Sequence, residues 1–326
     1  MVKIPLLSSG HFPGSAASHA TAQDGGVGSS AVLFARSTIG ALSGLVMQSG
    51  LPELQYSTDL TRGIVPKNIH SHNDYWRQVP LLDALSFGCK SVEADLHLVN
   101  GEILVGHKSV SLSSPRTLDS LYLDPLFEIF QMQNPSSNVA TNSTAATVNG
   151  VFDYDPEQSL QLLLDYKTDG PTLHPVVISA LDRFRSLDLL TTWNSATSSL
   201  STRPLTVICT GNCPLSLVNA QQPLRDIFFD TPLHDISNSS YTSANSMMAS
   251  TSLKRFTSWT NMLDIDDVLF AKIQGMVQAA HAKGIRTRFW ETPNWPTFVR
   301  DNTWRTLLRA GVDWLNADNL FAASQI

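Results

Sequence analysis

The chain contains few charged residues. Asp, Glu, Lys and Arg make up 15% of its 326 residues, against about 25% in an ordinary soluble domain. The formal net charge is -6 at pH 7, so the sequence has no basic footprint. Domains that bind nucleic acid carry such a footprint, and we therefore expect no nucleic-acid partner. An anionic phosphodiester would need a metal ion and a few local cations to bind here.

Cysteine is also scarce. The three cysteines, Cys89, Cys209 and Cys213, do not form a metal-binding array. Cys209 and Cys213 are close enough in sequence to bridge, but the sequence alone leaves their pairing open. Two glycosylation sequons begin at Asn142 and Asn238. Together with the low charge, they favour a protein of the secretory pathway.

Long hydrophobic runs are missing from the N-terminal region. Its stretches of Gly, Ser and Ala resemble a linker, and its one apolar run, residues 31–47, is interrupted by Arg36. A bilayer span needs about 20 apolar residues, and a signal peptide would lie nearer the start, after basic residues. We therefore expect no clear signal peptide or transmembrane helix. Residues 1–60 are predicted to be a flexible or weakly helical extension, and residues 61–326 a single domain.

Beyond residue 60, apolar strands alternate with amphipathic helices. We expect strands at 64–71, 90–98, 103–107, 159–167, 205–209, 226–230, 251–259, 286–290 and 313–317. The helices are expected at 80–87, 117–133, 173–187, 264–284 and 296–310. About eight strands separated mostly by helices predict an α/β fold, a somewhat irregular barrel of the TIM (β/α)8 type. No Gly-rich phosphate loop follows a strand, which argues against nucleotide binding.

Two carboxylates share one face of the second expected strand. In Ser91-Val-Glu-Ala-Asp-Leu-His-Leu98 the side chains alternate, so Glu93, Asp95 and His97 point to one side while the other side is apolar. Such a pair is typical of oxygen ligands for a hard cation. The alternative is an edge strand whose charges lie in water.

Further polar residues stand where the other apolar runs stop. In this type of barrel the active site lies at the carboxyl ends of the strands. The candidates there are His70, His72, Glu93, Asp95, His107, Asp165, Lys167, Trp259, Trp290, Asn316 and Asp318. Three carboxylates can hold a divalent cation, and two histidines suit acid–base catalysis because their ordinary pKa is about 6.5. Lys167 can stabilise negative charge on a phosphoryl oxygen.

Four stretches in this order resemble the phospholipase C-like phosphodiesterase superfamily. They are Ser71-His-Asn-Asp-Tyr75, Ser91-Val-Glu-Ala-Asp95, Leu104-Val-Gly-His107 and Leu164-Asp-Tyr-Lys167. That superfamily includes glycerophosphodiester phosphodiesterases, phosphoinositide phospholipases C and sphingomyelinases D. Within it the combination is most similar to the fungal altered inheritance of mitochondria protein 6 family. The resemblance runs from about Val65 to Leu320.

The resemblance implies a role for each matching residue. It implies that His72 and His107 are the catalytic histidines and that Lys167 assists them. Glu93, Asp95 and Asp165 are implied as metal ligands, with Asn73 as a further one. The implied metal is Mg²⁺, with Ca²⁺ as the alternative. Trp290 matches an aromatic residue that lines the substrate pocket.

The expected function is that of a metal-dependent phosphoric diester hydrolase. Its substrate would be of the glycerophosphodiester or phospholipid type, and its nucleophile either water or a neighbouring substrate hydroxyl, which would give a cyclic phosphate. We expect a monomer that is able to contact a membrane surface. Two alternatives stay open: a zinc amidohydrolase-type barrel that uses His70 and His72, and a barrel that binds a phospholipid headgroup without turnover.

Overall fold

The computed structural model describes residues 56, 58–135, 148–257 and 265–326. The chain divides into two units, Met1–Tyr56 and Ser57–Ile326, and all elements below belong to the second. Most of the predicted extension (residues 1–60), the sequon at Asn142 and the candidate Trp259 lie outside the described residues. Among the described residues, no helix is long and apolar enough to cross a membrane.

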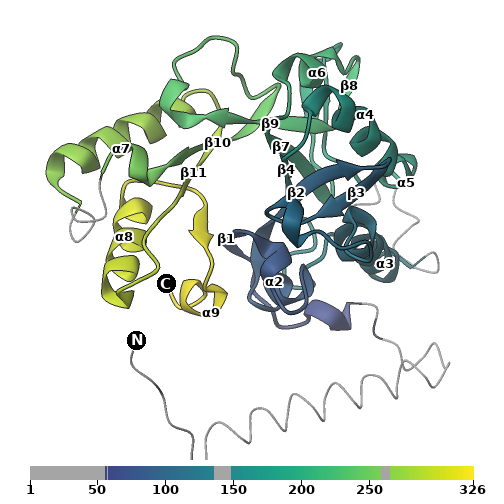
Figure 1. Cartoon of the computed structure of the whole chain (residues 1–326), viewed down its shortest axis with the longest axis horizontal. Coiled ribbons are helices and arrows are strands. Elements are labelled where there is room, and N and C mark those ends of the chain that lie inside the picture. The colour runs from purple at the N-terminus through teal and green to yellow at the C-terminus, as the bar shows by residue number, and fades with distance from the viewer. Residues whose placement is uncertain (1–55, 57, 136–147, 258–264) are drawn as a thin grey trace, which may run out of the picture. The chain divides into compact units, whose positions relative to one another are not determined.

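Eight parallel strands form a nearly closed barrel, in the order β11-β10-β9-β7-β4-β2-β1-β12 (Figure 1). Their bounds are Lys67–Ser71 (β1), Cys89–Val99 (β2), Leu160–Tyr166 (β4), Leu205–Gly211 (β7), Ile227–Pro232 (β9), Ser246–Ser252 (β10), Arg286–Trp290 (β11) and Leu315–Ala317 (β12). The ends meet where the Trp314 amide donates to the Thr287 carbonyl at 3.0 Å. The predicted barrel is therefore confirmed.

Helices follow most of the strands along the chain. They are α2 (Leu82–Ser86), α3 (Asp124–Gln133), α4 (Gly170–Ala180), α5 (Asp182–Ser186), α6 (Leu215–Ala220), α7 (Asp267–His281), α8 (Thr297–Arg309) and α9 (Leu320–Ala323). In Figure 1, α7 and α8 lie outside β10 and β11. Asp266 caps α7, because its side chain accepts from the Leu269 amide at 2.7 Å.

The barrel departs from the regular pattern at two places. β3 (Glu102–Val105) returns antiparallel to β2 through a tight turn at Asn100 and Gly101, both with positive φ. A small antiparallel sheet, β6-β5-β8, is an insertion that the sequence did not predict. Its strands are Thr192–Asn194 (β5), Ser199–Ser201 (β6) and Leu224–Arg225 (β8).

The strand expected at 251–259 is wrong in position. The structure places β10 at Ser246–Ser252, and a 3-10 turn follows at Leu253–Arg255. β10 has the sequence Ser-Met-Met-Ala-Ser-Thr-Ser, which contains no aromatic residue and only one of the β-branched residues that identify strands, Thr251. Its small polar side chains suit the crowded barrel interior, where Ser250 Oγ accepts from Arg288 Nε at 3.0 Å.

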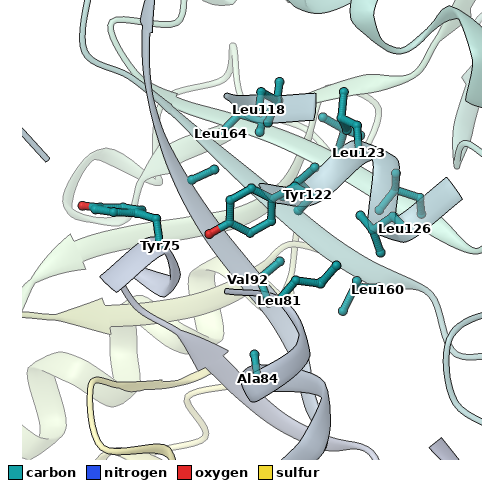
Figure 2. Packing of buried hydrophobic residues seen from close by; sticks show 14 of the residues in the cluster. Tyr75, Leu81, Ala84, Val92, Leu118, Tyr122, Leu123, Leu126, Leu160 and Leu164 are labelled. Carbon is teal, nitrogen blue, oxygen red and sulfur yellow. The ribbon is translucent and has the colours of Figure 1, made fainter. Parts of the chain in front are cut away.

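The apolar faces of the strands pack against the helices and their preceding turns. Figure 2 shows Val92, Leu160 and Leu164 from the strands beside residues of the 118–126 segment and Leu81, and each of these strand side chains is fully buried. Burying one such side chain contributes about 1.5–3 kcal/mol. Because the outer faces supply this apolar core, the inner faces are free to carry polar groups.

Candidate active site

Strand pairing brings the three predicted carboxylates together. β2 and β4 are neighbours in the register that sets Asp95 opposite Asp165, and Glu93 lies two residues before Asp95 on the same face. One oxygen from each of the three lies within 4.8 Å of the others. Glu93 and Asp95 are only 4% and 1% exposed. The alternative of an edge strand with solvated charges is therefore wrong, because β2 lies inside the sheet.

The cluster has the features of a cation site. Asp95 Oδ1 is buried and has no hydrogen-bond partner among the described residues. Burial, together with the neighbouring charges of Glu93 and Asp165, raises the pKa of Asp95 to about 6. A divalent cation would use the unpaired oxygen and relieve the repulsion among the carboxylates. The residues present therefore fit an oxygen-preferring cation such as Mg²⁺.

Lys167 lies at the edge of the carboxylate cluster. Its Nζ donates to Asp165 Oδ2 at 2.5 Å and lies 3.1 Å from Asp95 Oδ2. Burial lowers the pKa of Lys167, but the two carboxylates outweigh burial and leave that pKa raised. The side chain is therefore a fixed positive charge beside the cluster, and its role in stabilising a phosphoryl oxygen stays a prediction.

His72 follows β1 and flanks the cluster on one side. Its Nδ1 lies 2.7 Å from Asp318 Oδ1, and its Nε2 lies 4.0 Å from Glu93 Oε2. Arg77 donates to the backbone carbonyls of His72 and Asp318 and so ties the two loops together. The Nδ1–H donates to the carboxylate, which leaves Nε2 for proton transfer at the cluster.

His107 has the matching arrangement on another flank. Its Nδ1 lies 3.2 Å from Asp95 Oδ2 and 3.3 Å from the Tyr75 hydroxyl. Trp76 packs edge-on against the ring, with the centroids 5.4 Å apart. The side chain is 43% exposed. Nε2 of His107 is therefore the nitrogen that a substrate can reach.

Three polar side chains support the segments that carry the histidines. Asp74 is fully buried and accepts from the Ser71 hydroxyl at 2.6 Å and from the Leu81 amide at 2.7 Å. Tyr122 donates to Asp74 at 3.1 Å, and Figure 2 shows its hydroxyl pointing out of the apolar cluster. His97 donates to the Gly106 carbonyl at 2.9 Å, next to His107. His97 is thus a supporting residue rather than a ligand.

Asn73 lies at the site in a left-handed conformation, with φ of 48°. Its amide donates to Glu93 Oε2 at 3.0 Å, and its side-chain oxygen lies 2.5 Å from the Tyr75 hydroxyl. That hydroxyl is also 2.8 Å from Asp95 Oδ2. Since the hydroxyl carries one proton, it donates to one of these oxygens at a time. The role of Asn73 as a metal ligand stays a prediction.

An arginine lies beneath the carboxylates inside the barrel. Arg288, 3% exposed, has Nη1 2.6 Å from His70 Nε2 and 3.8 Å from Glu93 Oε2. A guanidinium only donates, so His70 Nε2 accepts and its proton is on Nδ1, which donates to Ser91 at 2.7 Å. Burial, aided by Arg288, lowers the pKa of His70 to about 4. The lone pair that a zinc ion would need is therefore engaged by a cation.

Sequence reasoning gave two residues of this site no role and left a third without its partner. Tyr75 lies in one of the four quoted stretches and Arg288 in an expected strand, but neither was assigned a role. Asp318, a candidate at the barrel mouth, was not recognised as the partner of His72. The sequence offered one indication that these residues belong to the site, namely their positions within or just after apolar strands. Trp290 ends β11 two residues beyond Arg288 and shares its inward face. Its contact with substrate stays a prediction.

Comparisons with known proteins place these features in a family. A model of the AIM6-like phosphodiesterase domain matches residues 58–230. Altered inheritance of mitochondria protein 6 homolog from Arthroderma benhamiae is 41% identical over 281 residues, which are 83% of this chain and 87% of that protein. Altered inheritance of mitochondria protein 6 from Saccharomyces cerevisiae is 34% identical over 292 residues, which are 82% of this chain and 72% of that protein.

Among solved structures, a glycerophosphodiester phosphodiesterase from Parabacteroides distasonis covers 81% of this chain and 97% of its own. It has 12% identity to this chain and a TM-score of 0.43. The chain belongs to the altered inheritance of mitochondria protein 6 family, whose matching region is a phosphodiesterase-like domain.

Proposed function

We propose that the protein is a metal-dependent phosphoric diester hydrolase that acts on a glycerophosphodiester- or phospholipid-type substrate. The observation that carries this proposal is the pair of histidines on the flanks of the carboxylate cluster. Each has its Nδ1 beside a carboxylate, at 2.7 Å for His72 and 3.2 Å for His107. Such pairing fixes the ring and the tautomer, as a general acid or base requires.

The roles follow from the contacts. A divalent cation held by Glu93, Asp95 and Asp165 would offset negative charge on the phosphoryl group. Lys167, fixed beside Asp165, would add positive charge at the same place. One histidine takes a proton from the attacking oxygen through Nε2, and the other gives a proton to the leaving oxygen. Water or a neighbouring substrate hydroxyl would be the nucleophile.

Specific contacts weigh against the alternatives. A zinc amidohydrolase would need Nε2 of His70, but Arg288 Nη1 lies 2.6 Å from that atom. Zinc would have to displace a buried guanidinium, which is costly. A barrel that only binds a headgroup has no need for two histidines with paired carboxylates. The amidohydrolase alternative also leaves the grouping of three carboxylates without a role.

Product analysis with added Mg²⁺ tests the proposal. The substrates are a generic aryl phosphodiester, glycerophosphodiesters, lysophospholipids and sphingomyelin. We expect turnover of at least one diester, and a loss of about 10²-fold or more in His72→Asn and in His107→Asn. His281→Asn, which removes an exposed histidine paired with Asp313, should keep full activity. Headgroup binding without turnover would contradict the proposal and favour the binding barrel.

A further inference from the structure

The turn that ends β7 lies directly against the third carboxylate. Cys209 and Cys213 form a disulfide, which answers the question that the sequence left open. The bridge encloses Gly211, the last residue of β7. β7 pairs with β4 in the register that sets Gly211 opposite Tyr166, one residue beyond Asp165. The Asn212 amide donates to the Tyr166 carbonyl at 2.9 Å, so the turn is also bonded to β4.

Gly211 allows no side chain at this place. It has a φ of +66°, and a Cβ built on it would lie 2.1 Å from Asp165 Oδ1. The same Cβ would lie 2.7 Å from the Tyr166 carbonyl oxygen. The backbone of the turn therefore forms a wall against one side of the Asp165 carboxylate. Lys167 holds the other oxygen of that carboxylate at 2.5 Å.

The bridge anchors this wall to the core. Cys209 is fully buried within β7, and Cys213 is 6% exposed at the start of the segment that leads into α6. The two ends of the turn are thus fixed to each other across three residues. Without the bridge, the left-handed turn at Gly211 would be held by hydrogen bonds alone, from the Asn212 amide and side chain and from the Thr210 hydroxyl. Asp165 would then lose a covalently fixed neighbour.

We propose that the Cys209–Cys213 disulfide is a positioning element of the cation site. It holds the 210–212 turn so that Gly211 confines Asp165 to the orientation in which its oxygen meets those of Glu93 and Asp95. This inference rests on the cation site of the proposed function. It predicts that opening the bridge weakens cation binding while the barrel stays folded.

Mg²⁺ binding by calorimetry tests this, at a temperature where all variants are folded. Cys213→Ala opens the bridge but leaves Cys209 in the core. We expect its Kd for Mg²⁺ to rise about tenfold or more, as when groups that orient metal ligands are lost. Cys89→Ala, which removes the buried free cysteine at the start of β2, should keep the Kd of the native chain.

The native chain treated with a dithiol provides a second route that changes no residue. The dithiol supplies two electrons and two protons, the bridge becomes two thiols, and the dithiol closes to its own disulfide. Thiol titration after denaturation verifies the reduction. The reduced chain should show the weaker Kd, and the Asn212 amide should exchange its hydrogen faster. If the bridge only stabilises the fold, its reduction would lower the melting temperature without changing the Kd for Mg²⁺.

Gly211→Ala tests whether the close approach of the Gly211 backbone to the Asp165 carboxylate matters for cation binding. Gly63→Ala is its matched control, because Gly63 also has a positive φ, +78°, but a Cβ there meets nothing within 4 Å. Only Gly211→Ala should weaken Mg²⁺ binding. Equal Kd values for the oxidised, reduced and Cys213→Ala chains would overturn the positioning role and leave the proposed function intact. Absence of Mg²⁺ binding by the oxidised native chain would instead overturn the cation site and this inference together.

Discussion

Asp318 Oδ1 lies 2.7 Å from His72 Nδ1, although 246 residues separate the two in sequence. The other oxygen of Asp318 accepts from Asn294 at 2.7 Å. Burial raises the pKa of Asp318, but its hydrogen bond to His72 and the charge of His72 outweigh burial, so that pKa is lowered. Asp318 is therefore a charged partner that orients His72 and favours its protonated form.

Asp318→Asn should lower kcat/KM by about 10²-fold, because the ring loses its preferred tautomer. Burial lowers the pKa of His72, and Asp318 is the main group that raises it above its ordinary value. Removing the negative charge should therefore move the limb of the pH–rate profile that His72 controls to lower pH. The profile of kcat/KM and an NMR titration of His72 measure both effects.

Asp313→Asn is the matched control for this variant. Asp313 also lies 2.8 Å from a histidine, His281, but two residues before β12, away from the carboxylates. Its loss should reduce stability without moving the pH–rate profile. An Asp318→Asn profile that coincides with the native one would show that Asp318 does not act through His72.

Tyr75→Phe should reduce turnover by about tenfold or more, while the ring keeps its packing. The hydroxyl lies 2.8 Å from Asp95 Oδ2 and 3.3 Å from His107 Nδ1, so its loss loosens the orientation of both groups. Tyr166→Phe is the control. The buried hydroxyl of Tyr166 lies 3.1 Å from His174 Nδ1 and does not contact the carboxylate cluster. Steady-state kinetics of the two variants should differ. Equal effects would mean that Tyr75 only supports the fold.

The lowered pKa of His70 predicts that the free energy of unfolding decreases in mild acid. Its pKa is about 4 in the folded chain and about 6.5 when unfolded. Between these values the unfolded state binds more protons, so this contribution to the free energy of unfolding falls as the pH decreases from about 6.5 to about 4. Asp95 and Asp230 have folded pKa values of about 6 and act in the opposite direction, since their folded forms bind more protons.

A comparison with His70→Gln isolates the histidine. The free energy of unfolding, measured by urea titration in chelator, should fall by about 3 kcal/mol more in the native chain than in the variant between pH 7 and pH 4. If the difference in the free energy of unfolding between the two chains stays constant with pH, His70 takes up its proton with the same pKa in the folded and unfolded states. That result would contradict the prediction.

The grouping of the three carboxylates was predictable because it depends on local pattern and on neighbouring strands. Alternation along β2 puts Glu93 and Asp95 on one face, and the next parallel strand supplies Asp165. β11 was predicted with its observed bounds, Arg286–Trp290. β11 was recognisable in the sequence because it contains β-branched and aromatic residues, which favour strands.

The remaining parts depend on tertiary structure. The pairing of His72 with Asp318 exists only because β1 and β12 are neighbours in the barrel. Nothing in the sequence marks Arg288 as buried, yet the barrel encloses it between His70, Glu93 and Asp230. β10 was misplaced because its small polar residues signal a loop unless the interior they line is known.

The rate of hydrolysis of an aryl phosphodiester, measured as Mg²⁺ is returned to chelated protein, tests the central claim most directly. We predict no turnover in chelator and a saturable recovery with Mg²⁺. In Asp95→Asn, which alters the carboxylate whose buried Oδ1 has no hydrogen-bond partner in the described part of the chain, the recovery should need more Mg²⁺. Undiminished turnover in chelator, or full activity of His107→Ala at saturating Mg²⁺, would contradict a metal-dependent, two-histidine phosphodiesterase.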